Sequence, residues 1–120
     1  MKNKQITAEF VNFILGPRIN AAGRVDTAEA ALRLMMTESA EEALALAEQC
    51  EAHNRRRQKI ESQIMQEAQD LIGREVNFKE HTVMVVAKEG WHLGVLGIVA
   101  AQLADRFYRP AILISTAAGE

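Results

Sequence analysis

The chain has 120 residues, of which 48% are hydrophobic, and it carries a formal net charge of −2. This length fits one modest domain or a small domain with an appendage, and the apolar fraction excludes global disorder. The near-neutral charge excludes a chain-wide basic surface for nucleic acid, so any such binding has to be local. A single cysteine excludes an intramolecular disulfide, and no apolar run is long enough to span a bilayer. We therefore expect a cytoplasmic protein without membrane contact.

The N-terminal region begins with a short apolar segment, residues 10–15, which is predicted to be a helix or a strand. Gly16 and Pro17 are expected to end it, because this pair is a strong breaker of regular structure. Residues 16–24, Gly-Pro-Arg-Ile-Asn-Ala-Ala-Gly-Arg, have no apolar periodicity and are framed by glycines. They are predicted to form an ordered loop.

Residues 26–29, Asp-Thr-Ala-Glu, have the form of a capping box with an acidic cap. They predict a short helix from about Thr27 to Met36. Four of its apolar side chains are expected to face a core: Ala31, Leu32, Met35 and Met36.

A second capping box begins at Ser39 and predicts a much longer helix, because no Pro or Gly follows until Gly73. Gly73 is expected to cap its C-terminus. Residues 51–59 are polar on nearly every side, as in a helix that bridges two packed bodies; a coiled coil is the alternative. Apolar stripes are expected at both ends of the helix: Ala43, Leu44, Ala47 and Cys50 in the first, and Ile60, Ile64, Ala68 and Leu71 in the second.

The C-terminal third contains a strand, a glycine-bearing turn, a helix and a second strand. Residues 82–87 predict the first strand, Gly90 marks the turn, the helix runs to about Phe107, and residues 111–114 predict the second strand. The predicted fold class is α/β, with an N-terminal helical segment and a long connector helix followed by a partial βαβ domain.

The turn after the first strand is a candidate binding site, because ligands of open α/β sheets lie where strand carboxyl ends meet helix N-termini. His92 could donate to a phosphate oxygen and Trp91 could stack on a base or sugar. Gly94 and Gly97 would let a phosphate backbone come close. The alternative, which the spacing by itself favours, is that these glycines allow close helix–sheet packing and that Trp91 covers the edge of the core. The pattern matches neither a dinucleotide-binding fingerprint nor a P-loop.

A second candidate site is the predicted loop, where Arg18, Asn20 and Arg24 lie close together in the sequence. Arginine is the forked donor that suits phosphate, and loops commonly carry binding residues. Either arginine alone more often pairs with a nearby carboxylate such as that of Asp26, but the three residues together favour binding.

The other polar residues predict no chemistry. Residues 55–57, three arginines, could contact a nucleic-acid backbone, but they are more typical of a solvated helix face with i,i+4 partners such as Glu51. Cys50 is expected to be buried and inert. No cluster of Asp and His has metal-ligand spacing, and no nucleophile stands near a base.

Two of these segments closely resemble signature segments of the RecJ-type single-stranded-DNA-specific exonucleases. They are residues 16–24 and residues 89–100, Glu-Gly-Trp-His-Leu-Gly-Val-Leu-Gly-Ile-Val-Ala. The long helix between them and the Arg109-Pro110-Ala-Ile-Leu segment before a strand also match. The resemblance covers the chain from about Ile6 to Ile114, and the two long motifs in this order make it specific.

The resemblance implies that this chain is a piece of a longer, metal-dependent enzyme. RecJ-type enzymes are DHH phosphoesterases whose N-terminal domain holds Mn²⁺ or Mg²⁺ through Asp and His residues. A long helix joins that domain to a second one of the DHHA1 type, and single-stranded DNA passes between them and is degraded from its 5′ end in recombination and repair. By this resemblance, residues 1–38 are the tail of the catalytic-domain region, 39–73 the connector helix, and 74–120 the truncated start of the DHHA1-type domain.

The roles that the resemblance implies concern binding rather than catalysis. We expect the parent to be an exonuclease with single-stranded DNA and other repair proteins as partners, and this piece to position DNA, to hold no cofactor and to lack nuclease activity alone. Two alternatives stay open: another DHH phosphodiesterase acting on short oligonucleotides or cyclic dinucleotides, and a non-catalytic scaffold that binds a partner protein. The expected nucleic-acid-binding residues are Arg18, Asn20, Arg24, Trp91, His92 and Gly94.

Overall fold

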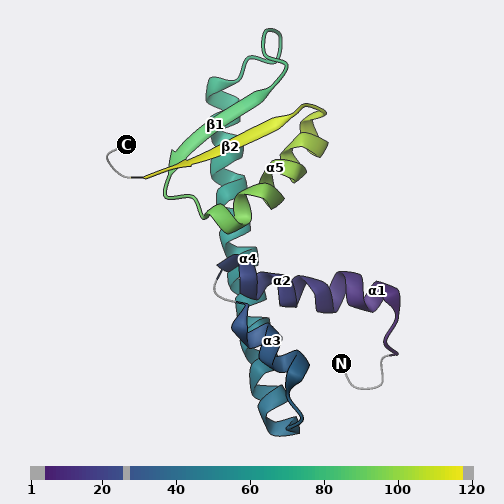
Figure 1. Ribbon diagram of the computed structural model, residues 1–120. Coiled ribbons are helices and arrows are strands. Elements are labelled where there is room, and N and C mark those ends of the chain that lie inside the picture. Colours follow the sequence, from purple (N-terminus) through teal and green to yellow (C-terminus); the bar gives the residue numbers. More distant parts are fainter. Residues whose placement is uncertain (1–4, 26–27, 118–120) are drawn as a thin grey trace. The chain divides into compact units, whose positions relative to one another are not determined.

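The computed structural model describes residues 5–25 and 28–117, without the side chains of residues 22–25. The α/β class is confirmed, because a series of helices is followed by two parallel strands joined by a helix (Figure 1). In chain order the elements are α1 (Ala8–Phe10), the π-helical η1 (Val11–Leu15), α2 (Gly16–Val25), α3 (Glu29–Met36), α4 (Ala40–Glu75), β1 (Met84–Glu89), α5 (Leu93–Phe107) and β2 (Ala111–Thr116).

The chain divides into two compact units, Met1–Arg57 and Gln58–Glu120. The helix α4 contributes its first part to the first unit and its remainder to the second. Each unit has its own buried apolar residues, which are described separately below. The three functional regions that the resemblance implies, residues 1–38, 39–73 and 74–120, are a different kind of division and stay a prediction.

The first unit begins with a continuous helical run, so the predicted break at Gly16 and the predicted loop of residues 16–24 are both wrong. A π-turn carries the chain across the break, with the Gly16 N–H donating to the carbonyl of Val11, five residues earlier. A Cβ at Gly16 would lie 2.9 Å from that carbonyl oxygen, so only glycine fits the turn without a shift. Pro17 then stands in the first turn of α2, where its fixed φ suits a helix and its missing N–H costs little.

The next helix, α3, begins at Glu29; the predicted cap, Asp26 and Thr27, lies outside the described residues. Ala31 is buried as predicted, and it forms a small core with Cys50, against which Ile19 and Leu34 pack. Three other predicted core residues are exposed instead. Positions 30, 31 and 34 share one face of the helix, and at about 100° per residue the other three positions lie on the sides facing away from it. The exposed three are Leu32, Met35 and Met36.

The long helix α4 starts as predicted, with the Ser39 Oγ accepting a hydrogen bond from the Glu42 N–H at 3.2 Å. It runs to Glu75, so the predicted C-cap at Gly73 is wrong. The Val76 N–H still donates to the Ile72 carbonyl at 3.1 Å, which continues the helical pattern past the glycine. The end of a helix depends on these bonds, and an isolated helical glycine weakens a helix without having to stop it.

The buried stripes of α4 differ by one or two positions from the predicted ones. Leu46 is buried where Leu44 and Ala47 are exposed, and Ile72 is buried where Leu71 is only half-buried. Ile64, Ala68 and Cys50 are buried as predicted.

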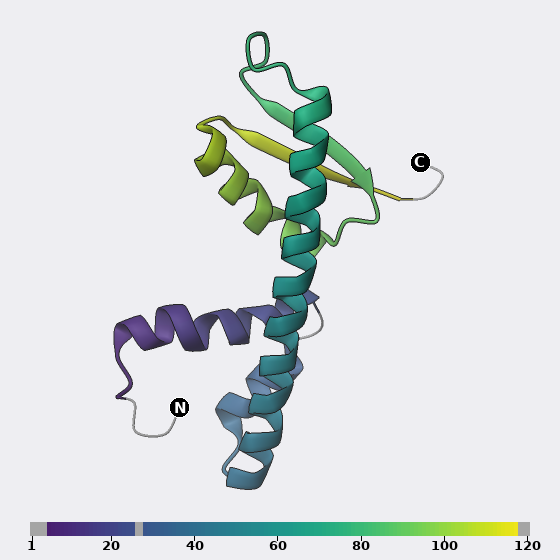
Figure 2. The same cartoon turned by 180° about the vertical axis from the view of Figure 1, so that it is seen from behind.

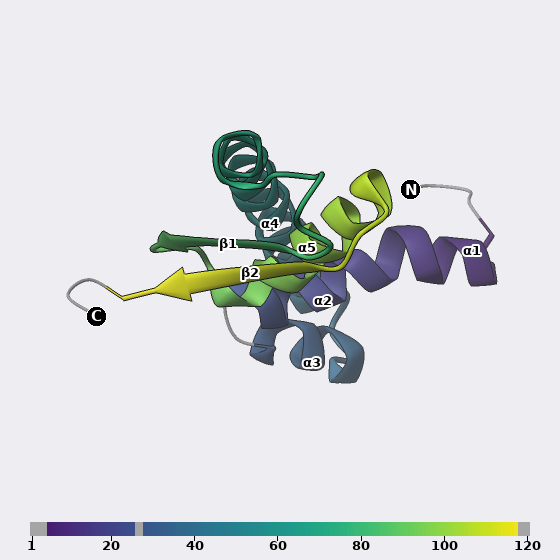
Figure 3. The same ribbon diagram turned by 90° about the horizontal axis from the view of Figure 1, so that it is seen from above.

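The sheet of the second unit consists of β1 and β2 in parallel, with Met84 opposite Ala111 and Glu89 opposite Thr116. The first strand begins two residues later than predicted and the second extends two residues further. Met84 and Val86 are buried, whereas Val85, which points to the other face, is half-exposed. The second part of α4 passes across both strands when the molecule is seen from behind (Figure 2), and it lies along one side of them when seen from above (Figure 3). The core of this unit takes Ile64, Ala68 and Ile72 from α4, Met84 and Val86 from β1, and Val95, Leu96, Val99 and Leu103 from α5.

Candidate nucleic-acid interface

The turn between β1 and α5 is held by the second strand. Gly90 has a φ of 81°, in the left-handed region that favours glycine. Its N–H donates to the Thr116 carbonyl at 3.2 Å, and the Ser115 Oγ donates to the Trp91 carbonyl at 2.6 Å. β2 therefore helps to hold the backbone of Gly90 and Trp91.

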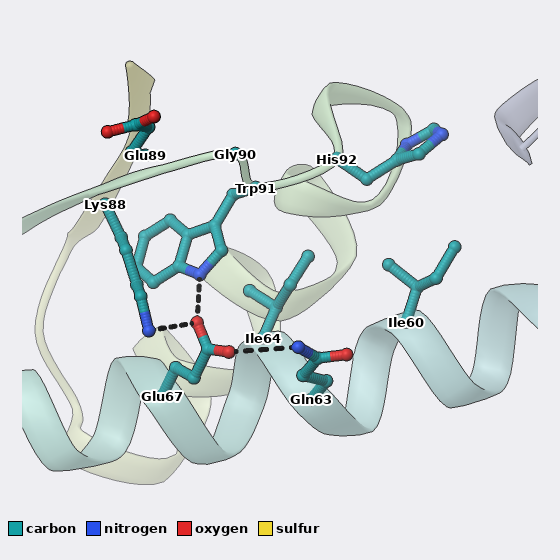
Figure 4. A pocket seen from close by; sticks show the side chains of 9 residues that line it. All are labelled: Ile60, Gln63, Ile64, Glu67, Lys88, Glu89, Gly90, Trp91 and His92. Carbon is teal, nitrogen blue, oxygen red and sulfur yellow. Dashed lines mark hydrogen bonds and ion pairs between the residues drawn. The ribbon is translucent and has the colours of Figure 1, made fainter. Parts of the chain in front are cut away.

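The indole of Trp91 is buried, with 5% of the residue exposed. Its Nε1–H donates to the Glu67 Oε2 at 2.9 Å, and the ring lies against α4 (Figure 4). Little of the ring is accessible to a base in this conformation. The indole instead covers the edge of the core, in agreement with the alternative that the sequence offers for Trp91.

His92 is the N-cap of α5, and its Nδ1 accepts a hydrogen bond from the Gly94 N–H at 3.1 Å. A neutral imidazole that accepts at Nδ1 carries its proton at Nε2. The imidazole points away from Glu67 and from the indole (Figure 4). The Nε2–H is thus an outward-directed donor in a fixed orientation.

Two backbone N–H groups in the first turn of α5 are hydrogen-bonded to His92. Besides the Gly94 amide, the Val95 N–H donates to the His92 carbonyl at 3.1 Å. Gly97 is exposed, and a Cβ there would meet no atom within 4 Å. Close packing therefore does not explain this glycine, and the backbone of α5 is open to a ligand at this position.

A cavity of about 310 Å³ lies beside the turn. In its lining, the Glu67 carboxylate pairs with the Lys88 Nζ at 2.7 Å, and the hydrogen bonds from Lys88, Trp91 and Gln63 lower the pKa of that carboxyl. The sequence prediction missed Glu67; its only signal is its place in α4 between the buried Ile64 and Ala68. The cavity is lined by Ile60, Gln63, Ile64, Glu67, Lys88, Glu89, Gly90, Trp91 and His92.

The predicted site residues of the first unit lie on α2. The Arg18 Nε pairs with the Glu51 carboxylate, its Nη2 lies 3.4 Å from the Glu51 Oε1, and its Nη1 donates to the Ile14 carbonyl at 2.7 Å. Arg18 lowers the pKa of Glu51. Asn20 is exposed, whereas the side chain of Arg24 and the suggested partner Asp26 lie outside the described residues.

The structure thus brings Trp91, His92 and Gly94 together in the second unit and places Arg18 and Asn20 on one helix of the first. Glu51 forms its ion pair with Arg18, and the positive charge of Arg55 also contributes to the lowered pKa of Glu51.

In residues 5–25 and 28–117, no group of three or more His, Cys, Asp and Glu side chains could hold a metal ion. Cys50 is a buried free thiol whose pKa is raised by burial. No helix in the same ranges combines the length and apolar character needed to cross a bilayer.

Curated relatives match nearly the whole chain but only a small share of their own length. The chain is 46% identical over 106 residues to the single-stranded-DNA-specific exonuclease RecJ of Bacillus subtilis, covering 88% of this chain and 13% of that protein. It is 33% identical over 116 residues to RecJ of Escherichia coli, covering 95% of this chain and 20% of the relative. No protein-family model matches the chain.

Solved structures agree with this similarity. RecJ from Thermus thermophilus in complex with Mn²⁺ matches with a TM-score of 0.82 and 34% identity, over 94% of this chain and 17% of that one. An exonuclease RecJ bound to manganese matches with a TM-score of 0.78 and 37% identity, over 91% of this chain and 27% of that one. The chain is therefore homologous to a segment of the RecJ single-stranded-DNA-specific exonucleases.

Proposed function

We propose that this chain is the strand-positioning part of a RecJ-type exonuclease that acts on single-stranded DNA. The observation that carries this role is His92, whose Nε2–H is directed outward by its own capping bond at the start of α5. The homology to single-stranded-DNA-specific exonucleases supports DNA as the ligand.

The proposed contacts go to the phosphate backbone, which positions a strand without reading its sequence. The His92 Nε2–H would donate to a phosphate oxygen, and the exposed backbone at Gly97 would let the strand approach. Trp91 would take part by supporting the turn, since its ring is buried. In the first unit, Arg18, Asn20 and Arg24 form a second proposed contact group.

The hydrolytic step is assigned to a part of the enzyme outside this chain. Thermus thermophilus RecJ has been solved with Mn²⁺ and with Mg²⁺, while the described residues here hold no group of side chains suited to a metal. A metal ion in such an enzyme polarises the phosphate and activates water. The residues of this chain would orient the strand for that step.

The test is a salt series of binding to labelled single-stranded DNA, with His92→Asn as the variant. Asparagine is a good N-cap, so this change keeps the cap of α5 and removes the Nε2–H donor. We expect affinity to fall with salt for the wild type, and to fall about tenfold in the variant, the size of one hydrogen bond to a charged group.

The matched control is His81→Asn, the same substitution in the loop before β1, where the His81 Nδ1 accepts from the Asn77 N–H. It is expected to bind like the wild type. Equal affinity of the wild type and His92→Asn would contradict the proposed contact. In a parallel incubation with Mn²⁺, the chain is expected to leave 5′-phosphorylated single-stranded DNA intact, and specific degradation would refute a positioning role without chemistry.

A further inference from the structure

Three donors from different parts of the second unit converge on one carboxylate, that of Glu67 (Figure 4). The Trp91 Nε1 lies 2.9 Å from its Oε2, and the Lys88 Nζ lies 2.7 Å from the same oxygen. The Gln63 Nε2 donates to the other oxygen, Oε1, at 3.2 Å. Both carboxylate oxygens are therefore engaged.

The positions of the two long-range donors give this cluster a specific role. Lys88 is the last residue but one of β1 and Trp91 follows Gly90, so Glu67 binds the chain on both sides of the left-handed glycine. Gly90 could adopt other φ values, but Lys88 before it and Trp91 after it are both bound to Glu67 of α4. Ser115 and Thr116 hold the backbone of the same turn from β2.

The energetic nature of the contacts separates this role from general stabilisation. The Lys88 side chain is 47% exposed, and an ion pair of this kind contributes little to the free energy of unfolding. The bond from a buried indole N–H to a charged acceptor is directional, and it fixes where the indole can lie. His92 is the residue that follows Trp91 in the chain, so a fixed Trp91 side chain restricts where His92 can lie.

We infer that Glu67 is a positioning residue, which holds the Gly90 turn so that His92 caps α5 and directs its Nε2–H outward. The significance of that orientation for DNA rests on the proposed function. The placement of the turn by Glu67 does not rest on the proposed function, so either hypothesis can fail without the other.

The chain offers a selective probe, because Trp91 is its single tryptophan. Nuclear magnetic resonance of the indole N–H reports on the bond to Glu67, and the ring-nitrogen shifts of His92 report its tautomer. We would compare the wild type with Glu67→Leu, which removes the acceptor, and Glu67→Gln, which keeps an acceptor oxygen but no charge. Asp70→Asn is the matched control, since Asp70 is an exposed carboxylate of α4 that accepts from Gln66.

In Glu67→Leu we expect the indole N–H signal to move and His92 to lose its fixed Nδ1-acceptor tautomer. Glu67→Gln is expected to retain most of the wild-type tautomer, and Asp70→Asn to retain all of it. Because Glu67→Leu could disturb folding, Trp91→Phe removes the same hydrogen bond from the other side and is expected to affect His92 in the same way. A folded Glu67→Leu or Trp91→Phe variant with wild-type His92 signals would overturn the inference.

Binding of labelled single-stranded DNA by the same proteins completes the test. We expect Glu67→Leu to lose affinity several-fold, as His92→Asn does, while Asp70→Asn binds like the wild type. A changed His92 tautomer with unchanged DNA affinity would leave Glu67 as the positioning residue and refute the proposed phosphate contact. An unchanged tautomer would refute the role of Glu67, whatever the affinity.

Discussion

The glycines of this chain serve different purposes, which the structure separates one by one. Gly90 has a positive φ, and Gly16 leaves room for the Val11 carbonyl in the π-turn. Neither a positive φ nor a close contact requires glycine at positions 73 and 97, because a Cβ at either would meet nothing within 4 Å. In a helix, a glycine of this kind costs about 0.5 to 1 kcal/mol relative to alanine. At Gly97 the proposed function supplies a reason, namely the approach of a strand to bare backbone.

This contrast predicts the effect of Gly97→Ala. The change is expected to raise the free energy of unfolding by about 0.5 to 1 kcal/mol, because alanine is the better helix former. It is also expected to weaken binding of single-stranded DNA, because the added methyl group occupies the surface that the strand approaches. Chemical denaturation and the salt series of binding measure the two effects.

Gly73→Ala is the matched control, with the same change on an exposed helical position of α4. It should give a similar gain in stability and leave DNA binding unchanged. If Gly97→Ala bound DNA as tightly as the wild type, the strand would not approach α5 at this residue.

At the level of elements, α2 and the first part of α4 are joined by Arg18. Its guanidinium binds the Glu51 carboxylate, and it also donates to the Ile14 carbonyl within the helical run. The side chains of Arg18 and Glu51 are 28% and 36% exposed, so the pair is screened by solvent. Arg18 therefore has a structural partner whether or not a phosphate also reaches it.

A double-mutant cycle of Arg18→Met and Glu51→Gln measures the contribution of this pair. We expect a coupling free energy of about 0.5 to 1 kcal/mol, the upper range for partly exposed ion pairs. The readout is the free energy of unfolding of the wild type, the two single variants and the double variant. Strictly additive effects would mean that the ion pair does not stabilise the first unit.

At the level of the whole molecule, each unit contributes a glutamate whose pKa the fold lowers, Glu51 in the first and Glu67 in the second. The pKa of Glu51 is lowered mainly by its hydrogen bond from Arg18, and that of Glu67 mainly by its hydrogen bond from Lys88. A carboxyl group with a lower pKa in the folded state contributes stability above its unfolded pKa. That contribution is lost as the pH falls through the folded value.

We therefore expect the free energy of unfolding to be nearly constant around neutral pH and to decline below the ordinary glutamate pKa of 4.5. The unfolded chain binds these protons more tightly than the folded one does in that range, which sets the sign of the change. Denaturation curves at a series of acidic pH values measure it. In the Glu51→Gln and Glu67→Gln double variant the decline should be shallower, and an identical decline would assign the acid sensitivity to other groups.

Much of the secondary structure follows from the sequence because its signals are local. The capping box at Ser39 and the glycine-free run after it predict α4, and the apolar runs near Met84 and Ala111 predict the two strands to within two residues. The long motifs also predict the homology to RecJ exonucleases. These features depend on residues a few positions apart, so one chain is enough to recognise them.

The tertiary structure decided what the side chains do. Trp91 could have faced a ligand, but its indole is buried against Glu67, a residue 24 positions earlier. The choice between a stacking ring and a supporting one depends on which distant carboxylate, strand and helix surround the turn, and such partners come together only when the chain folds.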